Sequence, residues 1–257
     1  TWSRVSLIQP VNDPGFLGMS VTRMCETANG AWLLGSHAAD WSKKPLETQQ
    51  YILRSEDQGE TWHLLPGARK AGWSVPEYNR MDEGRPIWLQ GSEVFFMART
   101  PAGQIWTSRS HDDGQSWSDP KPSSLVHPDA PPMVFHSSDR KTLINFFHNR
   151  HTGTQYTGLS GTMDGMKDRS EIWVTLSSDG GRNWSEPRFL FANATQMNPE
   201  KNGWFNHQVS YLDAVIDKGT IHVFCPHLWN RAVYLTLQES DLQKLPTKEM
   251  LQKTLPR

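Results

Sequence analysis

One eight-residue motif, Ser-x-Asp-x-Gly-x-x-Trp, constrains the fold of this chain more than any other feature. Its three copies occupy residues 55–62, 110–117 and 177–184 of the 257-residue sequence. The Asp can accept hydrogen bonds from nearby backbone N–H groups, the Gly permits a left-handed turn, and the Trp can bury its ring under the next strand. The Asp residues lie 55 and 67 positions apart, a loose period that is typical of radially repeated β-structure.

Short apolar or β-branched segments between Gly, Pro, Asn and Asp turns predict β-strands throughout the chain. Each motif follows three such segments, and a last trio has no motif. The expected strands are 19–24, 31–36, 50–55, 85–89, 93–98, 104–110, 133–136, 142–148, 171–177, 209–216, 220–225 and 232–237. A further strand beginning near each motif Trp would complete a four-stranded blade. The sequence therefore predicts an all-β fold, a β-propeller with about four blades in this chain.

The two ends of the chain carry further expectations. Thr1-Trp2 and the strand-like segment 3–8 resemble the end of the motif, and Trp2 stands one blade-length before Trp62. We therefore expect residues 1–257 to form one propeller domain that lacks its N-terminal part; alternatively, segment 3–8 closes the last blade. Segment 240–253 is the one place where a short amphipathic helix is expected.

Composition excludes several classes of function. A formal net charge of −1 gives no electrostatic case for nucleic acid or a membrane surface, and no apolar run is long enough to span a bilayer. Cys25 and Cys225 are too few for a disulfide framework and lack metal-ligand spacing, so two small buried residues are expected, with a disulfide as the alternative. We expect neither a metal nor a cofactor.

The three motifs are similar to the Asp boxes, or bacterial neuraminidase repeats, of the sialidase superfamily. This resemblance implies a six-bladed propeller, of which about four blades would be present here. It also implies that Asp57, Asp112 and Asp179 are structural and lie at the periphery. Because Asp boxes also occur in non-enzymatic propellers, the motif alone indicates the fold and not the activity.

A second resemblance concerns the sialidase active site. Sialidases carry a Glu about fifteen residues before an Arg, ahead of an Asp box, as Glu83 and Arg99 stand here. A later Arg precedes the strand that enters another box, which Arg169 matches. A Tyr then opens a strand after the last box, as Tyr211 does in Ser-Tyr-Leu-Asp-Ala-Val. The resemblance implies Tyr211 as nucleophile, Glu83 as its base, and Arg99 and Arg169 as part of a carboxylate clamp.

The chemistry of sialic acid explains this set of residues. The sugar bears a carboxylate on its anomeric carbon, which arginines bind with charge-assisted, bidentate hydrogen bonds. A neutral Tyr avoids the repulsion that a carboxylate nucleophile would meet, and an adjacent Glu can take its proton. The implied function is an exo-acting glycoside hydrolase that releases terminal sialic acid, or a similar acidic sugar, from glycoconjugates with retained configuration. Its partner would be a sialylated or other acidic glycan, and the family favours an extracellular or periplasmic location.

Each assignment has a plainer alternative. Glu83 could be a solvated loop residue, and Arg99 and Arg169 could be surface residues. Tyr211 could simply pack within its strand. The family's first clamp Arg and its acid/base Asp precede the first Asp box, so the resemblance places both upstream of residue 1. Asp40 and Asp82 could substitute as acids, although no spacing supports them. Further candidates for anion contacts are Arg85, Arg150 and Arg231.

Two other classes of function remain open at the level of sequence. A non-catalytic Asp-box propeller could bind glycan or protein, and a lyase or hydrolase of uronic-acid polysaccharides would need a similar cationic pocket. The family's usual residues after the Glu are replaced by Gly84-Arg85-Pro86, which leaves room for an acidic sugar other than sialic acid. Aromatic residues expected in loops would suit sugar stacking in either class; they are Trp73, Tyr78, Trp204, Phe205 and Trp229.

Overall fold

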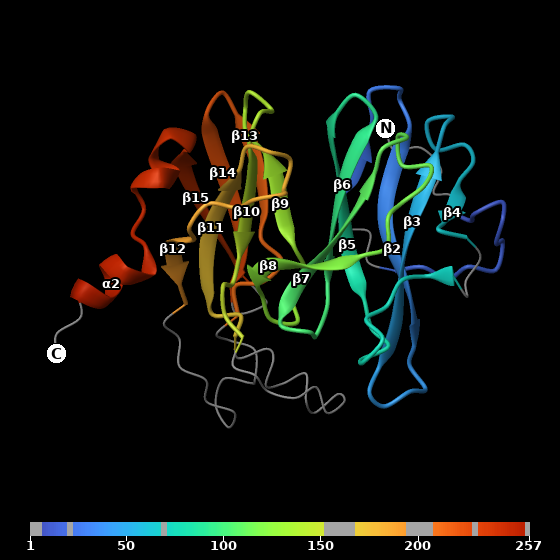
Figure 1. Ribbon diagram of the computed structural model, residues 1–257, viewed down its shortest axis with the longest axis horizontal. Helices are drawn as coiled ribbons and strands as arrows, with labels where there is room; N and C mark the ends of the chain where they lie inside the picture. The colour runs from blue at the N-terminus through green and yellow to red at the C-terminus, as the bar shows by residue number, and fades with distance from the viewer. Residues whose placement is uncertain are drawn as a thin grey trace.

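The computed structural model describes residues 7–19, 23–67, 71–151, 168–193, 208–227 and 231–254. It is all-β, with four small antiparallel sheets arranged as the blades of a four-blade β-propeller (Figure 1). Within each sheet, consecutive strands are neighbours, so every blade is a simple meander. Successive blades contact one another in chain order, and an ion pair between Arg23 and Asp213 joins the first sheet to the fourth.

The strands have the following bounds. The first sheet contains β1 (Met24–Glu26), β2 (Trp32–Asp40), β3 (Glu47–Ser55) and β4 (His63–Leu65). The second contains β5 (Asp82–Gln90), β6 (Glu93–Arg99), β7 (Gln104–Ser110) and β8 (Lys121–Val126). The third contains β9 (Met133–His136), β10 (Leu143–Phe147), β11 (Glu171–Ser177) and β12 (Arg188–Ala192). The fourth contains β13 (Asp213–Asp217), β14 (Thr220–His227) and β15 (Arg231–Gln238).

The predicted blade pattern is confirmed. Strands β7, β9 and β11 have the predicted bounds, and each motif lies between the third and fourth strands of its sheet. The fourth sheet has three strands among the described residues and no motif, as the last trio of segments predicted. Residues 1–6, which include the Thr1-Trp2 feature, lie outside the described residues.

Two predicted elements differ from the structure, and a third lies partly outside the described residues. Of the expected strand 19–24, residues 20–22 are not described, Met19 forms an isolated bridge to His37, and Met24 begins β1. Strand 209–216 begins only at Asp213, because Tyr211 has a left-handed φ of 62° that a strand does not accommodate. The expected helix 240–253 is split into the 3-10 helix η2 (Glu239–Lys244) and the helix α2 (Lys248–Thr254). Pro246 explains the break, since it disfavours a helical conformation at Leu245, whose ψ is 150°.

Hydrogen bonds within each motif explain its sequence. In the first copy, Ser55 Oγ donates to Asp57 Oδ1 at 2.8 Å, and Asp57 Oδ1 accepts the backbone N–H of Thr61 at 2.8 Å. The indole of Trp62 donates to the carbonyl of Gly59 at 3.0 Å, where φ is 93°. The Ser and Asp contacts recur in the other two copies, at Asp112 and Asp179. The motif Asp residues are therefore turn-forming, as predicted.

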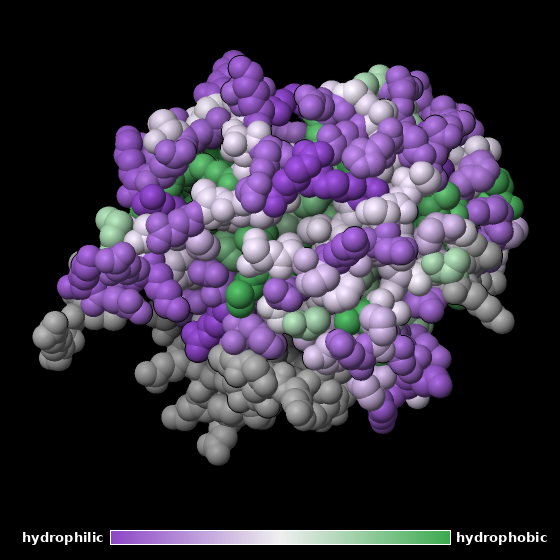
Figure 2. Space-filling view, in the orientation of Figure 1, coloured by the Kyte–Doolittle hydropathy of each residue, from purple (hydrophilic) through white to green (hydrophobic). Residues whose placement is uncertain are grey.

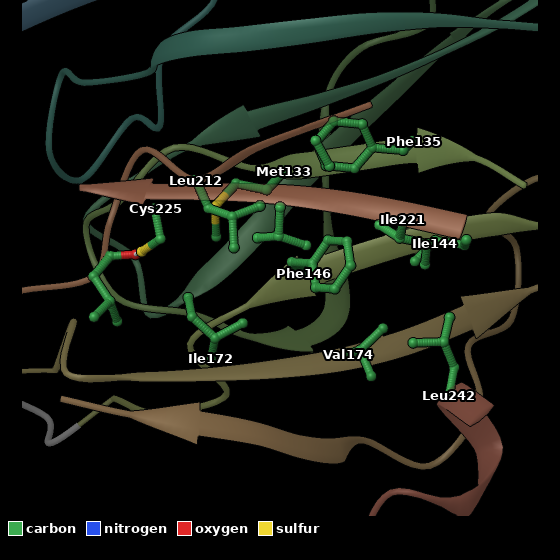
Figure 3. Packing of buried hydrophobic residues seen from close by; sticks show 13 residues of the cluster. Met133, Phe135, Ile144, Phe146, Ile172, Val174, Leu212, Ile221, Cys225 and Leu242 are labelled. Carbon is green, nitrogen blue, oxygen red and sulfur yellow. The ribbon is translucent and has the colours of Figure 1, made fainter. Parts of the chain in front are cut away.

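Hydrophobic clusters lie between neighbouring sheets and hold the blades together. The cluster between the third and fourth sheets includes Phe146 and Val174 of the third sheet and Ile221 of the fourth (Figure 3). The face shown in Figure 2 is mostly hydrophilic, with small separate apolar patches. Both Cys25 and Cys225 are buried free thiols, which confirms the simpler expectation over a disulfide. None of the described helices is long and apolar enough to cross a membrane.

Candidate active site

Three of the four residues that the sequence singled out converge on one hydrogen-bonded group. Antiparallel pairing of β5 with β6 places Asp82 opposite Arg99, so the start of β5, with Glu83, meets the end of β6. Tyr211 lies two residues before β13 and reaches the same point. The fourth residue, Arg169, lies two residues before β11, as the resemblance implied.

The Tyr211 hydroxyl donates to Glu83 Oε1 at 2.6 Å. Arg99 Nη1 contacts Glu83 Oε2 at 2.5 Å and the Tyr211 oxygen at 3.3 Å. Glu83 is 6% exposed and therefore buried, whereas Tyr211 is 40% exposed and therefore accessible to solvent. The solvated-loop interpretation of Glu83 is therefore wrong, and Tyr211 lies before β13 rather than within the expected strand 209–216.

Both members of this pair have strained backbones. Glu83 has a φ of 47° and Tyr211 a φ of 62°, values that residues other than glycine rarely adopt. Such strain costs about 1–3 kcal/mol per residue and is concentrated at functional sites. The backbone N–H of Glu83 donates to His37 Nδ1 at 3.4 Å, which helps to hold the irregularity at this point of β5.

Burial raises the pKa of the Tyr211 hydroxyl to about 12, with Glu83 adding to the shift and Arg99 opposing it. The phenol therefore keeps its proton at neutral pH, and its O–H donates a hydrogen bond to Glu83. This arrangement suits a nucleophile that is deprotonated by an adjacent base only as it reacts.

A buried ionic cluster, which sequence reasoning missed, surrounds Arg99. Its Nε lies 2.7 Å from Asp129 Oδ1 and 3.3 Å from Asp82 Oδ1. Arg80 lies behind them, with its Nε 2.9 Å from Asp82 and its Nη2 3.4 Å from Asp129. With Glu83 and Arg169, the cluster contains three arginines and three carboxylates, and their formal charges cancel. Arg99 is thereby fixed on two sides while its Nη1 faces the Tyr211–Glu83 pair.

The charges in the cluster support one another's ionised forms. Burial raises the pKa of Asp129, but the positive charges of Arg99 and Arg80 have the larger combined effect and hold this pKa below its ordinary value. Asp82 behaves in the same way. Burial also opposes the charge on Arg99, but Asp129, Glu83 and Asp82 raise its pKa well above the usual range. Asp129 is the one acidic residue of the segment His-Pro-Asp-Ala-Pro-Pro. Its isolation among proline and alanine residues is the sequence signal that could have singled it out.

Arg169 belongs to this cluster but does not touch the Tyr211–Glu83 pair in any described hydrogen bond. It is 1% exposed, so the surface interpretation is wrong, and its Nη2 donates to the backbone carbonyl of Asp129. Burial and the neighbouring Arg99 lower its pKa to about 10, so it remains a cation at neutral pH. Its own carbonyl accepts the Val209 N–H at 2.8 Å, which ties it to the segment leading to Tyr211.

A buried histidine supports the residue next to Tyr211. His148 Nε2 lies 2.9 Å from Ser210 Oγ, and its Nδ1 lies 2.8 Å from the Glu171 carbonyl. Because a carbonyl can only accept, Nδ1 carries the proton and Nε2 accepts from Ser210. His127 stacks on His148 with ring centroids 5.2 Å apart. Burial lowers the pKa of His148 to about 3, so its imidazole is uncharged at neutral pH.

The substitute acids proposed from sequence are unsuited to that role. Asp82 is buried in ion pairs with Arg80 and Arg99. Asp40 is exposed, and hydrogen bonds from Ser42 lower its pKa. Both carboxyls are ionised near neutral pH, so neither can deliver a proton to a leaving group.

The remaining candidates lie apart from the Tyr211–Glu83 pair. Arg150 pairs with Asp168 at 3.1 Å, and Arg231 is an exposed residue of β15. Trp73 packs against Phe96 and Trp117 rather than lying in an open loop, and Tyr78 packs against the same hydrophobic cluster. Trp204, Phe205 and Trp229 lie outside the described residues.

A sequence model of the BNR repeat-like domain matches residues 1–223. The chain belongs to the BNR repeat-like domain family. No curated protein matches its sequence. The resemblance to the sialidase superfamily is thus confirmed by the family match, and solved structures support it at the level of the fold.

Three solved structures illustrate the similarity of this BNR repeat-like domain. The NanB sialidase from Streptococcus pneumoniae has a TM-score of 0.59 and 16% identity, over 88% of this chain and 30% of that one. The intramolecular trans-sialidase from Ruminococcus gnavus has a TM-score of 0.55 and 16% identity, over 89% and 44%. A protein of unknown function from Dyadobacter fermentans has a TM-score of 0.61 and 16% identity, over 91% and 59%. This chain therefore spans between 30% and 59% of the length of these proteins, and identities this low show the fold alone.

Proposed function

We propose that the Tyr211–Glu83–Arg99 group belongs to an exo-acting, sialidase-like glycoside hydrolase that retains anomeric configuration. The observation that carries the proposal is the 2.6 Å hydrogen bond from an accessible tyrosine to a buried carboxylate. A phenol paired with a carboxylate base and an arginine can attack a sugar whose reacting carbon bears a negatively charged carboxylate group.

In the proposed first step, Tyr211 Oη forms a bond to the anomeric carbon while its proton passes to Glu83. The bond to the glycosidic oxygen breaks, and the leaving group takes a proton from an acid that we assign to no described residue. In the second step, water attacks the anomeric carbon and gives a proton to the conjugate base of that acid, while the phenol leaves and recovers its own proton from Glu83. Two displacements at one carbon retain its configuration.

The charge of the buried cluster fits an anionic substrate. Three arginines and three carboxylates balance while Glu83 is ionised. Once Glu83 has taken the phenolic proton, the cluster has one excess positive charge, which the carboxylate of a sialic acid would compensate. Arg99, which contacts both reacting residues, is the arginine best placed to provide this attraction in the transition state.

A non-catalytic glycan-binding propeller is the second candidate, and the burial of Arg169 favours it. A guanidinium that is 1% exposed and donates to the Asp129 carbonyl is a weak member of a substrate clamp. In that case the cluster would be structural, and Tyr211 would present an accessible ring edge to a sugar.

Release of a fluorogenic sialoside by the complete protein separates the two candidates. The hydrolase proposal predicts turnover in the wild type, its near-abolition in Tyr211→Phe, and a loss of about 10²–10⁴-fold in Glu83→Gln, because general-base assistance is of that order. Unchanged turnover in Tyr211→Phe would remove Tyr211 as the nucleophile. Sialoside binding without turnover in the wild type would favour the binding propeller.

A further inference from the structure

A cavity of about 600 Å³ lies between the four sheets, and residues of β1, β5, β9 and β13 line it. On β5 its lining begins at Arg85, two residues after Glu83, and runs to Trp88. The cavity is thus adjacent to the proposed catalytic group but is built from different residues.

The lining of this cavity has more positive than negative side chains. Among the described residues that line it, Arg23, Arg85 and Arg140 are positively charged and Glu26 is the one carboxylate. Arg85 is 5% exposed and lies over the ring of Phe135, with its guanidinium carbon 4.3 Å from the ring centroid. The cavity therefore contains a buried cation.

Asp213 gives Arg85 only partial compensation. Its carboxylate lies 3.6 Å from Arg85 Nη2, and its side chain is 64% exposed to solvent. Arg23 contacts the same carboxylate oxygen at 3.1 Å, so two guanidinium groups share one exposed acid. Burial and the charge of Arg23 lower the pKa of Arg85 to about 10, which leaves it protonated at neutral pH. A buried cation with so little compensation favours an additional anion.

A second polar group lines the same cavity. His136 Nε2 lies 2.5 Å from the Trp88 carbonyl and therefore carries the proton. Its Nδ1 is buried and has no hydrogen-bond partner among the residues that the structure describes. Burial lowers the pKa of this imidazole, so Nδ1 has a lone pair that can accept a hydrogen bond from a hydroxyl group.

We propose that this cavity binds a hydroxylated organic oxyanion, with Arg85 and Arg23 holding the anionic group and His136 Nδ1 accepting a hydroxyl. A guanidinium stacked on an aromatic ring keeps its N–H edge available, which suits a two-point contact with a carboxylate or sulfate. None of these three side chains belongs to the ionic cluster around Arg99, so the site does not depend on the proposed hydrolysis.

Isothermal titration calorimetry of the full chain tests the proposal, with D-glucuronate and sulfate as probes at an ionic strength fixed with sodium chloride. We expect both anions to bind at one site and neutral glucose not to bind. Arg85→Met should weaken both anions by about tenfold or more, the effect of losing a charge-assisted hydrogen bond. His136→Phe should weaken glucuronate alone, because sulfate has no hydroxyl to donate.

Two further variants keep the result interpretable. Lys244→Met removes one positive charge from an exposed ion pair that is not part of the cavity lining, and it should leave both affinities unchanged. Tyr211→Phe should also bind both anions normally, which separates this site from the proposed catalytic one. Because Arg85 is buried, Arg23→Ala, at a side chain that is 42% exposed, provides a second test if Arg85→Met does not fold. Absence of binding in the wild type, or unaltered affinity in a folded Arg85 or Arg23 variant, would overturn the proposal.

Discussion

The hydroxyl of Tyr211 donates to the carboxylate of Glu83 at 2.6 Å, although 128 positions separate the two residues in the chain. The first strands of the second and fourth sheets bring them together, at the ends where those strands begin. Both residues have left-handed backbones: Glu83 lies at an irregularity near the start of β5, and Tyr211 lies just before β13, so regular strand geometry would not orient their side chains in this way. This contact is the basis of the proposed chemistry.

The buried cluster should be sensitive to loss of a single carboxylate. Asp129→Ala would leave Arg99 and Arg80 with an uncompensated positive charge, and we expect the free energy of unfolding to fall by about 3–5 kcal/mol. Denaturant unfolding followed by circular dichroism measures this loss. Asp241→Asn, which breaks an exposed pair with Lys244, is the matched control and should cost less than about 1 kcal/mol. Equal effects in the two variants would contradict the structural role of the cluster.

Acid should destabilise the fold through His148. Its pKa is lowered from 6.5 to about 3, so between these values the unfolded chain binds a proton that the folded chain does not. Stability is therefore complete above pH 6.5 and is lost as the pH falls, by about 2 kcal/mol from this residue at pH 5. Unfolding free energies measured at pH 7 and pH 5 should show this loss, and His148→Gln should reduce it. An identical difference in the variant would show that other groups cause it.

Left-handed glycines in the Asp boxes should resist substitution more than those in open turns. A Cβ at Gly114, where φ is 78°, would lie 2.8 Å from Leu33 Cδ1, whereas one at Gly219, where φ is 83°, would have no heavy atom within 4 Å. Gly219→Ala should cost roughly 1–2 kcal/mol from backbone strain alone. Gly114→Ala should cost about 1–3 kcal/mol more because of crowding. Thermal unfolding of both variants measures the difference, and equal losses would argue against tight packing between the first two blades.

Both cysteine thiols should be unreactive in the native protein. Burial raises the pKa of Cys25 and of Cys225 to about 12, so the thiolate that attacks alkylating agents is scarce at pH 8. Iodoacetamide followed by mass spectrometry should show no modification under native conditions and two modifications in guanidinium chloride. Rapid native labelling of either thiol would mean that it is more accessible than the structure indicates.

The repeated motif made the blades predictable from the sequence. The ion pairs of the site could not be predicted in this way. The boxes fixed the order of strands and turns, since a Ser, an Asp and a Gly within five residues make local hydrogen bonds that need no distant partner. Glu83, Arg99 and Arg169 were found through the resemblance to sialidases, because they stand where that family carries a Glu and two Arg relative to its boxes. Asp129 and Arg80 were missed because their roles depend on contacts between blades, which no local pattern encodes. The start of β13 was misplaced for a similar reason: the left-handed turn at Tyr211 accompanies its contact with Glu83.

The central claim is that Tyr211 is a nucleophile, and covalent labelling tests it most directly. A 3-fluorosialosyl fluoride has a good leaving group, while its second fluorine destabilises the oxocarbenium-like transition state of both steps, so a glycosyl-enzyme should persist. After incubation with the complete protein, peptide mass spectrometry should find one adduct on Tyr211, absent from Tyr211→Phe. An adduct on Glu83 or another residue, or no adduct on a protein that turns over sialosides, would contradict the account.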